Sequence, residues 1–194
     1  MTGTATAKIV SGTTAVAVTV KRVVAKVEVQ CTMTDSFRAK YGNGCVEVKK
    51  LTLSRGAEKS YLIDQTTSKY ATVSSSFTSA QDAFCDKTGA SKTNAYKYNN
   101  LFYLNEKAAA AAGSRVKVLI DAIYDADGNL STTADQMPVT YETELTGAAD
   151  GKIARNGSYK VNAKLDGLTG QDVTLAVTVA NWDALATQDV NLGQ

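Results

Sequence analysis

The sequence contains no histidine among its 194 residues, and this absence excludes several kinds of site. Without imidazole the chain cannot form a Ser-His-Asp or Cys-His catalytic pair, a histidine-ligated zinc site or a histidine pH switch. No segment approaches the run of about 20 apolar residues that a membrane-spanning helix needs. We therefore expect neither an enzyme nor a bound metal or cofactor, and no direct insertion into a membrane.

Charge of one sign is also scarce, since 21 Lys and Arg nearly balance 19 Asp and Glu for a net charge of +2. A nucleic-acid-binding face needs concentrated basic charge, so we expect no nucleic-acid partner. Apolar residues make up 44% of the chain and charged residues 21%, which is ordinary for a globular protein able to bury a core. Residues 1–7 lack the charged start and apolar run of a signal peptide, which indicates a cytosolic chain or a mature or truncated exported one.

The cysteines number 3, and no two of them have the C-x-x-C spacing of a redox motif or metal knuckle. Cys31 continues an apolar alternation and is interpreted as a buried core residue. Cys45 and Cys85 lie in polar surroundings typical of loops. A disulfide between Cys45 and Cys85 is one alternative for an exported chain, and two unpaired loop thiols are the other.

Alternation of apolar and polar residues with a period of two dominates the chain and predicts strands with one packed and one solvated face. Turn signals rich in Asp, Asn and Gly separate these stretches. We therefore predict an all-β fold, an antiparallel β-sandwich. The alternating stretches are 16–20, 27–33, 46–53, 116–124, 139–145, 159–165 and 173–179, and the turns are 125–129, 148–151, 156–157 and 167–170.

Helix signals are weak by comparison. Residues 106–112 are rich in alanine and are expected to form an exposed loop or a single helical turn, ended by Gly113. Residues 54–100 are polar with scattered aromatic residues, and we expect a long decorated connection that contains short strands. The prediction is thus a sandwich with a long loop region and at most short helical turns.

Two groups of carboxylates have the spacing of a reactive or metal-binding site. Glu142 and Glu144 share one face of a predicted strand, where a solvated surface is favoured over acid–base chemistry. Residues 125–129, with the sequence DADGN, resemble the start of a calcium loop, but the trailing glutamate of an EF-hand is missing. A tight turn is therefore favoured there, and calcium remains the alternative.

Aromatic residues and the chain's tail offer two candidate binding surfaces. Tyr96, Tyr98 and Tyr103 are able to stack on a ligand such as a sugar, although a sheet face with a surface patch is the simpler interpretation. Residues 183–194 follow Trp182 and alternate once more, which predicts a last strand. That strand either pairs within its own sheet or adds to the sheet of a neighbouring subunit.

Five stretches, in order from the start to the end of the chain, resemble the fimbrillins, the type V pilins of Bacteroidia. Two of them are similar to family signatures: LFYLNE resembles an aromatic stretch before a long strand, and IARNGSYKV resembles the pattern I-x-R-N-x-x-Y. The others are an arginine-containing strand, the segment that leads into it, and a strand that ends in tryptophan. The five stretches are 1–3, 18–27, 101–106, 153–161 and 177–182 with Gln188.

The resemblance implies a structural subunit of a fimbria on the outer membrane of a Gram-negative bacterium. An Arg-directed protease removes an N-terminal segment, and the groove that this leaves accepts the C-terminal strand of another copy, which gives a head-to-tail polymer. The implied partners are copies of the same chain, other pilus subunits and a host protein or glycan. On this chain the implied donor residues are Leu185, Val190 and Leu192, and the acceptor region contains Val16, Val18 and Val20.

The combined prediction is a sandwich of transthyretin-like or Greek-key type in three parts. These are an N-terminal strand segment over 1–22, the sandwich over 23–182 and a donor-strand-like tail over 183–194. The main alternative function is a monomeric tip or accessory adhesin that uses the patch of Tyr96, Tyr98 and Tyr103. A domain cross-linked by Lys–Asn isopeptide bonds and an enzyme are more distant alternatives.

Overall fold

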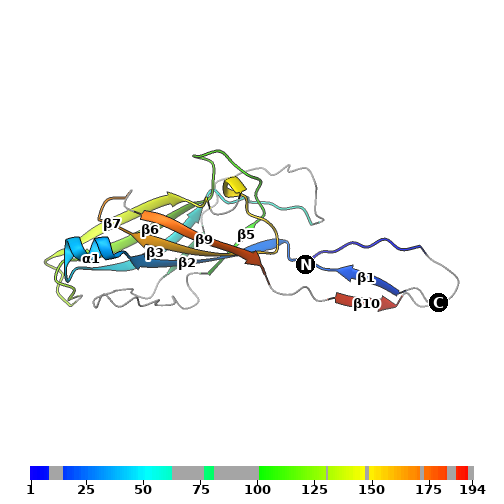
Figure 1. Ribbon diagram of the computed structural model, residues 1–194, viewed down its shortest axis with the longest axis horizontal. Coiled ribbons are helices and arrows are strands. Elements are labelled where there is room, and N and C mark those ends of the chain that lie inside the picture. The colour runs from blue at the N-terminus through cyan, green and yellow to red at the C-terminus, as the bar shows by residue number, and fades with distance from the viewer. Residues whose placement is uncertain are drawn as a thin grey trace.

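The computed structural model describes residues 1–8, 15–62, 77–80, 101–129, 131–146, 149–170, 173–182 and 187–191. It is elongated, with a β-sandwich and a narrow two-stranded ribbon that projects from one end (Figure 1). The elements are β1 Ala15–Thr19, β2 Val24–Met33, α1 Asp35–Tyr41, β3 Cys45–Ser54, β4 Phe77–Ala80, β5 Leu101–Asn105, β6 Lys117–Asp125, β7 Gln136–Glu144, the 3₁₀ turn Ala149–Gly151, β8 Gly157–Leu165, β9 Val173–Asn181 and β10 Thr187–Asn191.

The two layers of the sandwich each contain four strands, in the orders β5-β2-β8-β9 and β4-β3-β6-β7. Along β2 every second side chain is buried, from Ala25 to Met33, and β8 alternates in the same way. The buried faces of the layers form one core that includes Val27, Leu51, Ile120 and Tyr141. This arrangement confirms the predicted all-β sandwich.

One strand pair differs from the antiparallel prediction, because β2 and β8 run parallel, with Val29 opposite Val161. A parallel pair needs a long crossover, and here the chain passes through β3, β6 and β7 of the other layer between the two strands. Alternation within one strand reports which face is buried but carries no information about the direction of its neighbour.

The helix α1 was not predicted, although its ends carry recognisable signals. The side chain of Thr34 accepts a hydrogen bond from the amide of Phe37 (3.1 Å), which caps the first turn. Gly42 ends the helix with a φ of 57°, a conformation that glycine adopts without strain. The ring of Phe37 is buried and contacts Tyr41 and Tyr124, so α1 closes one end of the sandwich.

Two further predictions are corrected by burial. Cys45 is the first residue of β3 and is fully buried rather than in a loop, whereas Cys31 lies in the core as predicted. Glu106 and Lys107 are buried instead of lying in an exposed loop, because Lys107 pairs with Ile153 in a short β-bridge. Residues 108–112 form neither helix nor strand. No helix among the described residues is long and apolar enough to span a membrane.

Candidate functional site

The ribbon that projects from the sandwich consists of β1 and β10, which pair antiparallel. Val16 lies opposite Val190 and Val18 lies opposite Gln188. Neither strand joins one of the two layers of the sandwich. The side chains of β1 alternate between exposed and half-buried, so the fold buries none of them completely.

The ribbon brings together residues from both halves of the predicted donor–acceptor site. Val16 and Val18 lie in β1, Val20 follows it, and Val190 lies in β10. Leu185 and Leu192 lie outside the described residues. Within this chain, the predicted acceptor strand thus pairs with the predicted donor strand, in a defined register.

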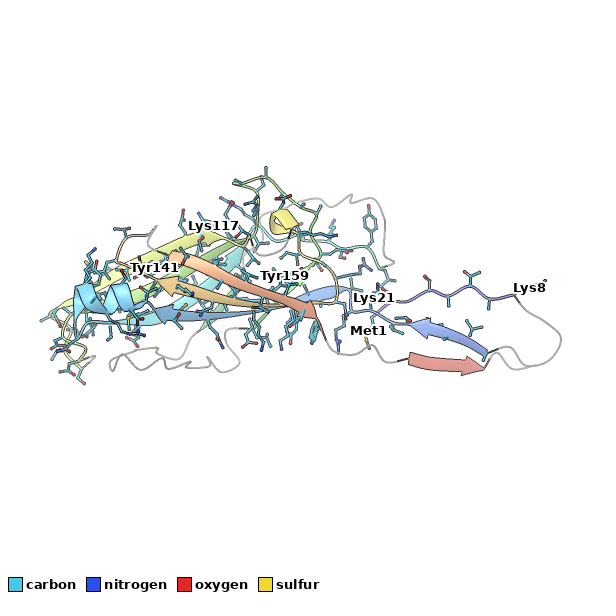
Figure 2. All side chains as sticks on the ribbon, viewed as in Figure 1. Met1, Lys8, Lys21, Lys117, Tyr141 and Tyr159 are labelled. Carbon is cyan, nitrogen blue, oxygen red and sulfur yellow. The ribbon has the colours of Figure 1, made fainter. Side chains whose placement is uncertain are left out.

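The N-terminal segment runs from the base of the ribbon outward, with Met1 and Lys21 near the sandwich and Lys8 at the far end (Figure 2). At the base, Thr2 and Lys21 exchange two backbone hydrogen bonds of 2.7 Å. The next residue, Gly3, lies so close to β1 that a Cβ atom on it would approach the Thr19 carbonyl oxygen to 2.2 Å. Only glycine permits that approach without a shift of the backbone.

A cluster of side chains fixes the base of the ribbon, where the chain enters β2 and leaves β9. The guanidinium of Arg22 lies 4.5 Å from the centroid of the Trp182 ring and donates a hydrogen bond to the Trp182 carbonyl (2.9 Å). On Trp182 stacks the ring of Tyr103, with centroids 5.6 Å apart. The cation–π contact therefore joins the segment between β1 and β2 to the residue that follows β9. The stack joins that residue to β5.

Asn156 also links the segment that enters β2 to the end of β9. Its side-chain oxygen accepts from the amide of Arg22 (3.3 Å), and its backbone carbonyl accepts from the amide of Trp182 (2.8 Å). The amide of Asn156 donates to the carbonyl of Val24 (3.1 Å). With a φ of 56°, Asn156 adopts a left-handed conformation that asparagine tolerates better than most residues.

Its neighbour Arg155 forms a buried ion pair with Glu106. Arg155 Nε donates to Glu106 Oε2 (2.9 Å), and Arg155 also contacts Oε1 through a second nitrogen. The side chains are 5% and 9% exposed. Arg155 donates further to the Tyr61 carbonyl (3.0 Å), and Ser60 Oγ donates to Glu106 Oε1 (3.0 Å), so the buried charges have several partners.

The ion pair joins the two signature stretches that carry the resemblance to the fimbrillins, 101–106 and 153–161. Beside it, Lys107 Nζ donates to the carbonyls of Arg55 (2.5 Å) and Ser114 (2.6 Å). Burial and then the charge of Arg55 lower the pKa of Lys107. The signature residues therefore form a buried network of charged side chains next to the base of the ribbon.

Tyr159 completes this support from β8. Its hydroxyl accepts from the amide of Ala154 (2.7 Å) and donates to the carbonyl of Lys152 (3.4 Å). Burial raises the pKa of Tyr159. A Cβ atom on Gly157 would lie 2.7 Å from the Tyr159 ring and 2.9 Å from the Ala154 carbonyl, so glycine is needed for this packing.

The two glutamates that the sequence places on one face of a strand both form ion pairs. Glu142 and Glu144 lie on the solvated face of β7, where Glu142 pairs with Lys117 (2.5 Å) and Glu144 with Arg55 (2.9 Å). These ion pairs support the interpretation of a charged surface, because each carboxylate already has a cationic partner.

Only part of the proposed ligand patch and disulfide falls on described residues. Tyr103 is 49% exposed and already stacks on Trp182, while Tyr96 and Tyr98 lie outside the described residues. Cys85 also lies outside them, so its disulfide with Cys45 stays a prediction.

No protein-family model matches the sequence, and no curated protein matches it either. Solved structures do match. A protein described as a cell-adhesion protein from Parabacteroides distasonis aligns over 84% of this chain and 52% of that chain, with 16% identity and a TM-score of 0.60. Another, from Bacteroides eggerthii, aligns over 85% of this chain and 57% of that chain, with 15% identity and a TM-score of 0.50.

A fimbrilin from Porphyromonas gingivalis also aligns, over 84% of this chain and 58% of that chain, with 17% identity and a TM-score of 0.47. The chain spans a little over half the length of the structures that it matches. This chain therefore has the sandwich fold of the two cell-adhesion proteins, in agreement with the predicted all-β sandwich.

Proposed function

We propose that the chain is a structural subunit of a cell-surface fimbria that polymerises head-to-tail through its ribbon. In the polymer, β10 of one copy pairs with the β1 region of the next copy. The observation that carries the proposal is the position of the last strand, which lies outside both layers of the sandwich and pairs only with β1 among the described residues.

An isolated two-stranded ribbon is marginally stable in water, because it has no second layer against which to bury a face. Val16 and Val18 remain only half-buried in the ribbon, and Val20 beside it is half-buried too. β10 also keeps one edge without a strand partner in the described chain, which is a template for pairing with another molecule, whereas Thr2 and Gly3 cover part of the second edge of β1. A neighbouring copy would satisfy both the apolar side chains and the edges.

The register within one chain, with Val16 opposite Val190, is available between chains as well. Exchange replaces each intramolecular pair by an equivalent intermolecular one, and burial of Leu185, Val190 and Leu192 in a groove would add on the order of 5–8 kcal/mol before entropy costs. Because donor and acceptor belong to different surfaces, the association is heterologous and continues as a filament rather than closing as a dimer.

Proteolysis at Arg22 would prevent this exchange. Arg22 lies between β1 and β2, so cleavage after it would separate β1 from the sandwich. That cleavage would remove the acceptor strand from each copy, so exchange between β1 and β10 requires the uncleaved chain.

Removal of residues 183–194 is the direct test. Negative-stain microscopy compares the truncated chain with the full chain, both with and without cleavage after Arg22. We expect the truncated chain to form no filaments. The sandwich of the truncated chain should still unfold cooperatively, since β10 belongs to neither of its two layers. Filaments formed by the truncated chain would refute assembly through the tail.

The alternative is a monomeric adhesin, which the descriptions of the two matching structures favour. Tyr103 is its one described aromatic candidate. Specific binding on a glycan array by a chain that stays monomeric would support the adhesin. Binding lost in Tyr103→Ala and retained in Tyr61→Ala would assign the ligand to this patch, because Tyr61 is an exposed tyrosine outside it.

A further inference from the structure

At the end of the sandwich opposite the ribbon, the turn between β6 and β7 gathers three carboxylates. Asp125 ends β6 beside Cys45, the first residue of β3, near α1 (Figure 1). Oxygen atoms of Asp125, Asp127 and Asp135 all lie within 4.8 Å of one another. The sequence pattern had indicated Asp125 and Asp127, and the fold adds Asp135 from the start of β7.

The hydrogen bonds of the turn use one oxygen of each carboxylate. Asp125 Oδ2 accepts from Gln136 Nε2 (3.0 Å), Asp127 Oδ1 accepts from the amide of Asn129 (2.6 Å), and Asp135 Oδ2 accepts from the amide of Asp127 (2.9 Å). Among the described residues, Asp125 Oδ1 is a buried oxygen without a hydrogen-bond partner. A cation in this region would thus meet three carboxylates, one of them with an oxygen that no described residue binds.

Asp125 supplies the decisive observation, because it is fully buried and its Oδ1 has no hydrogen-bond partner. The amides of Gly128 and Asn129 lie close to this carboxylate, but neither donates to Oδ1 with hydrogen-bond geometry. A buried carboxylate oxygen without a partner is costly, and native structures rarely leave one. Its cost is recovered if a cation binds there.

Charge points the same way. No lysine or arginine in the described ranges forms an ion pair with Asp125, Asp127 or Asp135. Glu142 and Glu144, which lie further along β7, each form an ion pair with a basic side chain. Carboxylates this close repel one another when all are ionised, unless a cation lies between them. Oxygen-only ligands suit a hard cation rather than zinc or copper.

We propose that Asp125, Asp127 and Asp135 form a binding site for Ca²⁺ that ties the β6–β7 turn together. Calcium fits better than magnesium because the ligands come from an irregular turn, and Ca²⁺ accepts flexible geometry with water filling the remaining positions. Magnesium demands near-ideal octahedral geometry. The site is independent of the ribbon, so its test does not depend on the proposed assembly.

Isothermal titration of the full chain with CaCl₂, after treatment with a chelator, tests the proposal. We expect one saturable site with a Kd of about 10⁻⁴–10⁻³ M, the range of extracellular calcium modules. Asp127→Asn removes an exposed ligand without disturbing the core and should weaken the affinity at least about tenfold, and Asp135→Asn should do the same. Asp150→Asn removes one charge from another exposed loop and should leave the affinity unchanged.

Thermal unfolding gives a second readout that does not depend on the heat of binding. Saturating Ca²⁺ should raise the Tm of the parent chain and of Asp150→Asn, and should leave the Tm of Asp127→Asn nearly unchanged. Absence of saturable binding up to about 10 mM Ca²⁺, or equal affinity in Asp127→Asn and the parent chain, would overturn the proposal. Tighter binding of Mg²⁺ than of Ca²⁺ would overturn the choice of cation.

Discussion

Replacement of Arg155 by alanine is expected to destabilise the sandwich by about 3–5 kcal/mol. The substitution removes the guanidinium that pairs with the buried carboxylate of Glu106. Ser60 continues to donate one hydrogen bond to that carboxylate. An uncompensated buried charge costs far more than an exposed one, because water no longer solvates it. Urea unfolding of the variant and the parent chain measures the loss.

Two controls separate the buried charge from other effects. Glu106→Gln in the Arg155→Ala background removes the buried charge that has lost Arg155 and should recover part of the lost stability. Asp150→Asn alters an exposed ion pair with an N–O separation of 4.0 Å and should change the free energy of unfolding by about 0–0.5 kcal/mol. A loss below about 1 kcal/mol in Arg155→Ala would contradict the structural role given to the ion pair.

Tyr141→Ala is expected to have a comparable effect, about 3–5 kcal/mol, through the core. The ring of Tyr141 is fully buried in the core, and its hydroxyl donates to the carbonyl of Gly167 (2.9 Å). Alanine removes the ring and leaves a cavity that a close-packed sandwich fills only in part. Chemical denaturation followed by circular dichroism measures the change.

Tyr141→Phe is the matched control, since it keeps the ring and removes only the hydroxyl. It should cost about 1–3 kcal/mol, because the Gly167 carbonyl loses a buried donor. If phenylalanine costs as much as alanine, the hydrogen bond rather than packing holds the two layers together at this point.

The strands were largely predictable from the sequence because each layer buries one face. Period-two alternation of apolar residues from Val27 to Met33, and from Tyr159 to Leu165, indicates a buried face whichever neighbour the strand has. The parallel pairing of these two strands was not predictable, since it depends on the path of the chain through the other layer. The helix after Thr34 is too short for apolar periodicity, and only its Thr34 and Gly42 caps mark it.

The contacts at the base of the ribbon were harder to predict. Glu106 and Arg155 both occur in stretches that resemble fimbrillin signatures, yet 49 positions separate them, and nothing local shows that they form an ion pair. Asp135 was missed as a third carboxylate for the same reason, because it joins Asp125 only when β7 folds back on β6. Sequence patterns report local conformation and burial, whereas these sites arise from contacts between residues that are far apart in the sequence.

The central claim, that β10 is exchanged between copies in the register seen within one chain, is tested most directly by disulfide trapping. Val16→Cys and Val190→Cys lie opposite each other, and such antiparallel pairs have Cα atoms about 4.5–5.5 Å apart, within disulfide range. A Cys85→Ser background removes a native cysteine that the structure does not describe. Filaments of this variant, oxidised after assembly, should give a ladder of covalent oligomers on a non-reducing gel. If the oxidised filaments instead give only monomers that carry the disulfide within one chain, the exchange is contradicted.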